Sequence, residues 1–302
     1  MGALALLWGS CFLWIEVALD HGLTPVQITV ARTVLGGAVL FALARRAGRP
    51  LPRGRGAWLR IAVAALLCNV VPFTLFGLGQ RTVDSGVAGV LNATTPLFSL
   101  LLGLALGTER GLRPVRLLGL LLGFAGVSLI FAPWRQDGLA SWGALMLLAA
   151  AASYAVAFAY MGRTLTGLDA GPVAVSAAQL LTAAALSAPA LPLTGGLLPD
   201  RVDATALVAV AVLGVFGTGA TFYLNYRLIE TEGPTGAATV GYLLPVVSVT
   251  LGAVVLGEDA GPRVLAGMAV VLAGVGLTRR KPSYHPVNSP AAPDTAVDRV
   301  AP

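Results

Sequence analysis

The chain has 302 residues, of which 56% are apolar and only 11% are charged, and its net charge is +6. A soluble globular domain carries about 25% charged residues, so a chain this poor in charge cannot cover a surface that faces water. The positive charge is nearly all arginine in short loops between apolar runs, which fits membrane orientation better than nucleic-acid binding. Cys11 and Cys68 fall inside apolar runs and the two histidines lie in a loop and the tail, so we expect no disulfide, metal or other cofactor.

In chain order, ten apolar segments are long enough to cross a bilayer, which takes about 20 helical residues. They cover residues 2–19, 25–44, 57–79, 85–106, 114–132, 141–162, 171–192, 204–226, 235–256 and 262–279. The first has neither a basic leader nor a small-residue cleavage site, so we expect a span and not a signal peptide. The sequence therefore predicts an all-α polytopic membrane protein. Residues 281–302 are rich in proline and are expected to form a disordered tail.

Basic residues mark the side of the membrane on which each loop lies. With the N-terminus in the cytoplasm, fifteen of the 20 basic residues fall in the inner loops and the tail, against four outside (Arg81, Arg135, Arg201 and Arg263). Such an excess is typical of cytoplasmic loops. We therefore predict a multi-pass protein of the bacterial inner membrane with both termini in the cytoplasm.

An internal repeat organises the chain. The apolar stretch Gly86–Glu109, with Pro96 in its middle, returns as Gly236–Glu258, with Pro245 in the matching place 149 residues later. The two glutamates are interpreted as interfacial acids near the start of the next helix, with proton coupling as the alternative. The prolines are interpreted as helix kinks that face one central cavity, with plain bending for packing as the alternative.

Other landmarks keep the same register in both halves. Arg32 stands seven residues after Pro25, and Gln179 stands seven residues after Pro172. Four glycines also match at an offset of 148 residues: Gly119 with Gly267, and Gly126 with Gly274. Because each half holds five spans, the second half is upside down relative to the first. The sequence therefore predicts two inverted repeats, residues 1–132 and 140–280, which is typical of transporters with a site near the midplane.

These features together resemble the EamA-type transporters of the drug/metabolite transporter superfamily. The resemblance covers residues 1 to about 280 and rests on the ten-span layout, the glycine-rich fifth and tenth spans and a small set of residues: Trp8, Gly9 and Ser10, Arg32, Pro96 with Glu109, and Pro245 with Glu258. It implies an inner-membrane carrier for small metabolites or drugs, often an exporter, that works by alternating access. It does not identify the substrate.

Arg32 and Glu16 are charges inside spans, where a charge at the midplane costs at least about 2.5–3.5 kcal/mol. The short loop between the first two spans brings them to similar depth. One interpretation is that Glu16 and Arg32 form a structural ion pair between these helices. The alternative is that they form a gate on the outer side, or a site for an anionic group. Gln179, at the matching place in the other half, is uncharged, so a gate based on charge would be asymmetric.

Polar and aromatic residues near the middle of the spans are candidates for a substrate cavity. Taken singly, each fits a contact between helices better than a ligand contact. As a set, aromatic walls with few charges suit a neutral or zwitterionic organic solute. The candidates are Trp8, Ser10, Phe12, Asn69, Phe73, Asn92, Tyr154, Phe158, Gln179, Phe222, Tyr223 and Tyr242.

We therefore expect a carrier of a small-molecule substrate, not an enzyme. An intramembrane enzyme would need a nucleophile with its base, or metal ligands, at depth, and the spans contain no histidine and no paired acids. A membrane sensor or assembly subunit without transport is the other alternative. The glycine pairs Gly103/Gly107 and Gly119/Gly123 allow close approach of helices, either within the chain or in a homodimer.

Overall fold

The structure, a computed structural model, describes residues 1–79, 82–83, 90–107, 114–132, 134, 141–166, 168–193, 203–255 and 261–278. This part of the chain contains helices and turns and no strand, so the predicted all-helical class is confirmed for it. Glu109, Glu258 and the tail 281–302 lie outside the described residues, and what we predict for them stays a prediction.

The helices of the first half follow the predicted segments closely. They are α1 (Gly2–Asp20), α2 (Pro25–Arg46), α3 (Arg55–Ala65), the π-helical turn η1 (Leu66–Val70), α4 (Val71–Gly79), α6 (Thr95–Ala105) and α7 (Pro114–Phe131). The helices of the second half are α8 (Trp142–Thr164), α9 (Gly171–Ser187), the 3₁₀ turn η3 (Ala188–Leu193), α10 (Ala204–Gly214), the π-helical turn η4 (Val215–Ala220), α11 (Thr221–Ala238), the 3₁₀ turn η5 (Thr239–Tyr242), α12 (Leu243–Val255) and α13 (Pro262–Thr278).

Several of these helices can cross a membrane. Among the described residues, six helical stretches are long and apolar enough: Pro25–Arg46, Arg55–Phe76, Pro114–Phe131, Trp142–Thr164, Gly171–Leu193 and Ala204–Val247. The last stretch is interrupted at Gly233, whose φ of 77° is not helical, and there the two predicted spans 204–226 and 235–256 meet. Large apolar side chains such as Leu59 and Leu101 are exposed along the outside, as expected for a surface in lipid. The chain is therefore a multi-pass membrane protein.

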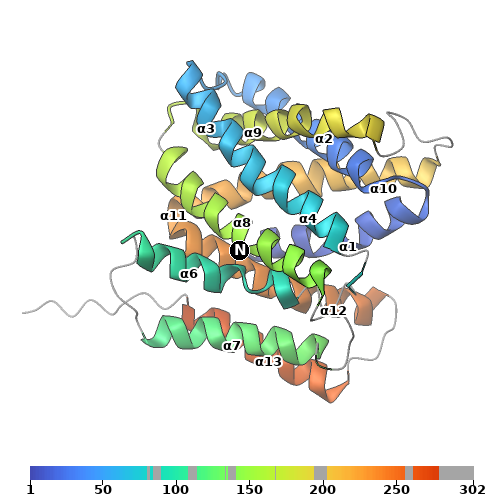
Figure 1. Cartoon of the computed structure of the whole chain (residues 1–302), viewed down its shortest axis with the longest axis vertical. Helices are drawn as coiled ribbons and strands as arrows, with labels where there is room; N and C mark the ends of the chain where they lie inside the picture. Colours follow the sequence, from blue (N-terminus) through green and yellow to red (C-terminus); the bar gives the residue numbers. More distant parts are fainter. Residues whose placement is uncertain are drawn as a thin grey trace, which may run out of the picture.

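Helices of the two halves interleave. Figure 1 shows α2, α3 and α9 at one end of the long axis, α7 and α13 at the other end, and α1, α8 and α11 between them. The most extensive contacts join α7 with α13, α2 with α9, and α4 with α8, so each joins the first half to the second.

The pair α7–α13 packs backbone against backbone at four glycines. A Cβ atom on Gly274 would lie 2.6 Å from the carbonyl oxygen of Gly119, and one on Gly267 would lie 2.9 Å from the carbonyl oxygen of Gly126. The reverse distances are 2.7 Å for Gly119 and 2.8 Å for Gly126. Small residues permit such close approach between membrane helices, so any larger side chain here would push the two helices apart.

Replacing Gly274 by alanine is expected to destabilise the protein by about 1–3 kcal/mol, because the added methyl group meets backbone atoms that cannot move aside. The measurement is the thermal unfolding midpoint in detergent. Gly276→Ala is the matched control on the same helix, since nothing lies within 4 Å of a Cβ at that position. Equal midpoints for the two variants would contradict this account of the α7–α13 contact.

Candidate functional site

Arg32 lies on α2 with its register fixed by the start of that helix. Thr24 and Gln27 form a reciprocal cap, in which the Thr24 hydroxyl accepts from the Gln27 N–H at 3.3 Å and the Gln27 side chain accepts from the Thr24 N–H at 2.9 Å. Pro25 follows in the first turn, where its missing N–H does no harm. Seven residues of helix then carry Arg32 about 10 Å along the axis.

The guanidinium of Arg32 is buried and has neutral partners. The side chain is 7% exposed, and its Nε donates to the Thr218 hydroxyl oxygen at 2.8 Å. The guanidinium carbon also lies 4.8 Å from the centre of the Phe73 ring, within the range of a cation–π contact. Thr218 belongs to η4 and donates its own proton to the Leu213 carbonyl at 2.9 Å, so only its lone pairs face Arg32.

Glycines bring α2 close enough for this bond. Gly36 lies one turn after Arg32, and a Cβ atom there would stand 2.7 Å from the Gly214 carbonyl oxygen and 2.9 Å from the Gly219 nitrogen. Gly214 directly precedes the π-helical turn that carries Thr218, and Gly219 lies within it. The backbone contact therefore sets the distance that the Arg32 side chain has to span.

A second polar pair joins the halves, this time from a helix of the second half to a turn of the first half. The Gln179 side-chain nitrogen on α9 donates to the Asn69 side-chain oxygen at 3.1 Å, and both residues are fully buried. Asn69 belongs to η1, the π-helical turn of the first half. The Ser153 hydroxyl on α8 donates to the Leu67 carbonyl of the same turn at 2.7 Å. Each π-helical turn thus takes hydrogen bonds from helices of the other half, which compensates for the interrupted helical pattern.

Aromatic side chains extend from Arg32 toward α8. The ring centre of Tyr154 lies 6.3 Å from that of Phe76 and 6.1 Å from that of Phe158. The Tyr154 phenol is within electrostatic range of Arg32, and so is the Cys11 thiol, which contacts the Gly217 carbonyl oxygen at 3.4 Å. We call Cys11, Arg32, Phe73, Tyr154 and Thr218 the Arg32 cluster.

Two members of this cluster, Cys11 and Thr218, are absent from the candidates found in the sequence. Thr218 follows Asn69 by 149 residues, the same offset that separates the two matched prolines. The repeat register could therefore have identified Thr218. No comparable signal points to Cys11, because a cysteine within an apolar run fits any buried position.

Other candidates lie elsewhere. Tyr242 is fully buried against Gly123 of α7, in a packing cluster of α6, α7 and α13 that does not include Arg32. Phe222 is buried in the core shared by α1, α9 and α11, and the Ser10 hydroxyl bonds to the Leu7 carbonyl of its own helix. Trp8 is half-buried beside that core.

Tyr223 lines an open-sided pocket of about 320 Å³ between the start of α1 and α11. Arg227 donates to the Tyr223 hydroxyl at 3.4 Å across this pocket wall. The Asn92 side-chain oxygen is buried without a partner among the described residues. The side chains of Phe12 and Glu16 lie outside the described residues, so the Glu16–Arg32 ion pair stays a prediction.

Both prolines stand at the start of a helix and not in its middle. Residues 90–92 are helical, residues 93–94 form a turn, and Pro96 lies in the first turn of α6. Pro245 is the third residue of α12, after the 3₁₀ turn η5. The predicted kink at Pro96 therefore takes the form of a break. Proline lacks the N–H group that the interior of a helix needs, whereas the first turn of a helix does not use that group.

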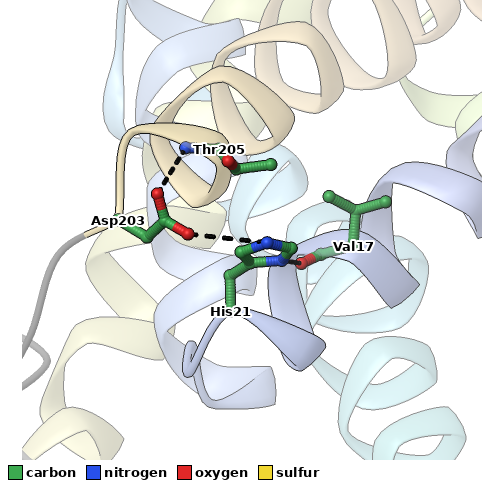
Figure 2. Close-up of polar contacts among 4 residues, drawn as sticks. All are labelled: Val17, His21, Asp203 and Thr205. Carbon is green, nitrogen blue, oxygen red and sulfur yellow. Dashed lines mark hydrogen bonds and ion pairs between the residues drawn. The ribbon is translucent and has the colours of Figure 1, made fainter.

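One polar contact joins the halves at the far end of α1. His21 follows the last residue of α1, and its Nε2 lies 3.5 Å from a carboxylate oxygen of Asp203, the N-cap of α10. Figure 2 shows the imidazole between Asp203 and the Val17 carbonyl, which its Nδ1 contacts at 2.8 Å. The other Asp203 oxygen accepts from the Thr205 N–H at 3.0 Å.

Comparison with known proteins decides the family. The model of the EamA-like transporter family matches residues 1–132 and again residues 141–280. The chain belongs to the EamA-like transporter family. It is accordingly a membrane transporter of the drug/metabolite transporter type, with a duplicated domain.

Relatives of this EamA-like chain match it along nearly its whole length. It is 27% identical to the uncharacterized inner membrane transporter YedA of Escherichia coli (strain K12), over 96% of this chain and 93% of the relative. It is 25% identical to an uncharacterized transporter of Archaeoglobus fulgidus, over 91% and 95%. A crystal structure with 23% identity covers 92% of this chain and 94% of its own with a TM-score of 0.77, which shows the same fold.

Removing either partner of the Gln179–Asn69 bond is expected to destabilise this EamA-like protein, because the remaining amide is left unsatisfied in the core. A double-mutant cycle with Gln179→Leu and Asn69→Leu, measured by unfolding in detergent, is expected to give a coupling of about 0.6–1.7 kcal/mol. Thr182→Val is the control on α9, since its hydroxyl bonds only to Ala178 of the same helix. A coupling of zero between Gln179 and Asn69 would contradict the observed bond.

Proposed function

We propose that this chain moves a small organic solute by alternating access, through a cavity between two inverted five-helix repeats, residues 1–132 and 140–280. The observation that carries the proposal is the reciprocal pair of bonds between the halves. Arg32 on α2 bonds to η4 of the second half, and Gln179 on α9 bonds to η1 of the first. A two-fold axis in the membrane plane generates such a pair, and inverted repeats of transporters have such an axis.

The glycine contacts support the same symmetry. Gly119 faces Gly274 and Gly126 faces Gly267, so exchanging the halves reproduces the contact. The proposed axis thus passes between α7 and α13 as well as between α2 and α9. Ten spans and two cytoplasmic termini complete the proposal, and the excess of arginine in one set of loops supports that orientation.

Buried polar groups and irregular helices favour transport over a sensor or an assembly subunit. A subunit that only needs to be stable gains nothing from a buried arginine, two π-helical turns and amide groups that are buried without a partner among the described residues. Irregular backbone at membrane depth is tolerated where it borders protein or a cavity. We place the substrate between the Arg32 cluster and the Gln179–Asn69 pair.

Substrate flux tests the function directly. The purified protein in proteoliposomes is expected to accumulate at least one solute from a panel of amino acids, carboxylates, neutral organics and cationic drugs, with and without a pH gradient. Empty liposomes are the control. A folded, reconstituted protein that moves none of these solutes would contradict the proposal.

Alternating access also predicts that the ends of α1 and α10 separate during the cycle, because these helices belong to different repeats. Cysteines at positions 21 and 203 place two thiols where His21 and Asp203 now meet, while the native Cys11 and Cys68 are buried. A short bifunctional thiol reagent is expected to abolish flux in the double-cysteine protein. Each single-cysteine protein treated with the same reagent is the control. Full flux with the cross-link intact would show that these ends do not part.

A further inference from the structure

We infer that Arg32 binds a carboxylate of the transported solute through its two terminal nitrogens. This inference rests on the proposed transport function and names the class of substrate: a small organic molecule with one carboxylate and an apolar body. Three features of the described structure carry it, namely a buried permanent charge, free donors on that charge and an aromatic wall beside it.

The charge of Arg32 is not compensated by the described protein. Arginine does not lose its proton in proteins, so burial cannot be relieved by neutralisation. Its described partners are the Thr218 hydroxyl, the Phe73 ring and the Cys11 thiol, and none of these groups carries a formal negative charge as a hydroxyl, ring or protonated thiol. No acidic side chain in the described ranges lies within ion-pair distance of Arg32. A buried charge without an opposite charge is strongly unfavourable, and a bound anion offsets part of that cost.

The donors of the guanidinium are only partly used. The group has five N–H bonds, of which the Nε–H donates to Thr218. Besides the weak sulfur acceptor of Cys11, which also lies within hydrogen-bonding reach of the guanidinium, the N–H bonds on Nη1 and Nη2 meet no acceptor among the described residues. Two of them form a planar fork that matches the two oxygens of a carboxylate. Because Thr218 holds the Nε side, the fork is oriented before a ligand arrives.

The surroundings suit an apolar body and one charge. Phe73 and Phe76 lie one turn apart on α4, and Phe76 contacts Tyr154, which contacts Phe158. These rings offer apolar surface beside the guanidinium. A second negative charge on the solute would face no described cation here and would stay unpaired, so we expect monocarboxylates to be preferred over dicarboxylates. A zwitterion with one carboxylate also fits.

The experiment uses ligands that share a body and differ in charge. The full-length protein in detergent is heated with phenylacetate, phenylacetamide or phenethylamine, and in a second series with hexanoate, hexanamide or hexylamine. We expect the carboxylate of at least one series to raise the unfolding midpoint in a saturable way, and its amide and amine to do so at least about tenfold more weakly. The same ligands are then tested as competitors of flux in proteoliposomes.

Variants connect the effect to Arg32. Arg32→Gln is expected to weaken carboxylate binding at least about tenfold, and Arg32→Lys, which keeps the charge but loses the fork, is expected to be intermediate. Arg45→Gln is the matched control, because Arg45 also lies on α2 beside an aromatic ring, Phe41 at 5.4 Å, but is exposed at the end of the helix. If Arg32→Gln does not fold, the Lys variant still tests the fork.

The outcomes separate this inference from the transport function. Carboxylates that stabilise the protein through Arg32, while no solute crosses the bilayer, support the inference and overturn the transport function. Flux or binding that is equal for carboxylate, amide and amine, or unaffected by both Arg32 variants, overturns the inference and leaves transport in place. A protein that responds to no carboxylate, yet loses stability equally on Arg32→Gln and Glu16→Gln, assigns Arg32 to a structural ion pair and also overturns it.

Discussion

A permanent charge inside a membrane-spanning helix determines how this part of the molecule is built. Arg32 cannot be neutralised, so groups from other helices must surround it. Thr218, in a π-helical turn, accepts from Arg32 and donates its own proton to the Leu213 carbonyl of α10. The hydrogen bond from Arg32 also requires α2 to lie close to the π-helical turn, and Gly36 allows that approach. The cap at Thr24, the glycine contact and the irregular turn thus contribute to one hydrogen bond between the halves.

The same dependence holds between the halves as wholes. Both π-helical turns have side-chain partners in the other half: Gln179 and Ser153 reach η1, and Arg32 reaches η4. In lipid, backbone groups released from a helix need partners within the protein. Contacts with the other half therefore help to stabilise each irregular turn. In the proposed cycle, a change of contact between the halves would therefore alter helix geometry most directly at these two turns.

The helix order could be predicted from the sequence because apolar length and turn residues act locally. The predicted span 25–44 is α2 with its cap at Thr24. The four glycines that match between the halves lie in one helix contact, with Gly119 against Gly274 and Gly126 against Gly267. The site could be predicted only in part. Arg32 is visible as a charge in an apolar run, but its partner Thr218 lies 186 residues away, and a threonine in a span gives no signal of its own. Tyr242 has the sequence context of a cavity residue, yet Gly123 leaves a space on α7 that its ring fills.

The difference between Arg32 and Gln179 explains how a symmetric fold can hold an asymmetric solute. Both residues stand seven positions into matching helices and bond to matching turns. Gln179 meets Asn69 in one hydrogen bond between two neutral amides, whereas Thr218 accepts one of the five donors of a permanently charged guanidinium. One end of the proposed cavity is thus neutral, and the other carries a positive charge with donors in excess. An anionic group on the solute would then bind at the Arg32 end of the proposed cavity. In this proposal the duplicated fold determines the motion, and Arg32 alone determines the orientation of the solute.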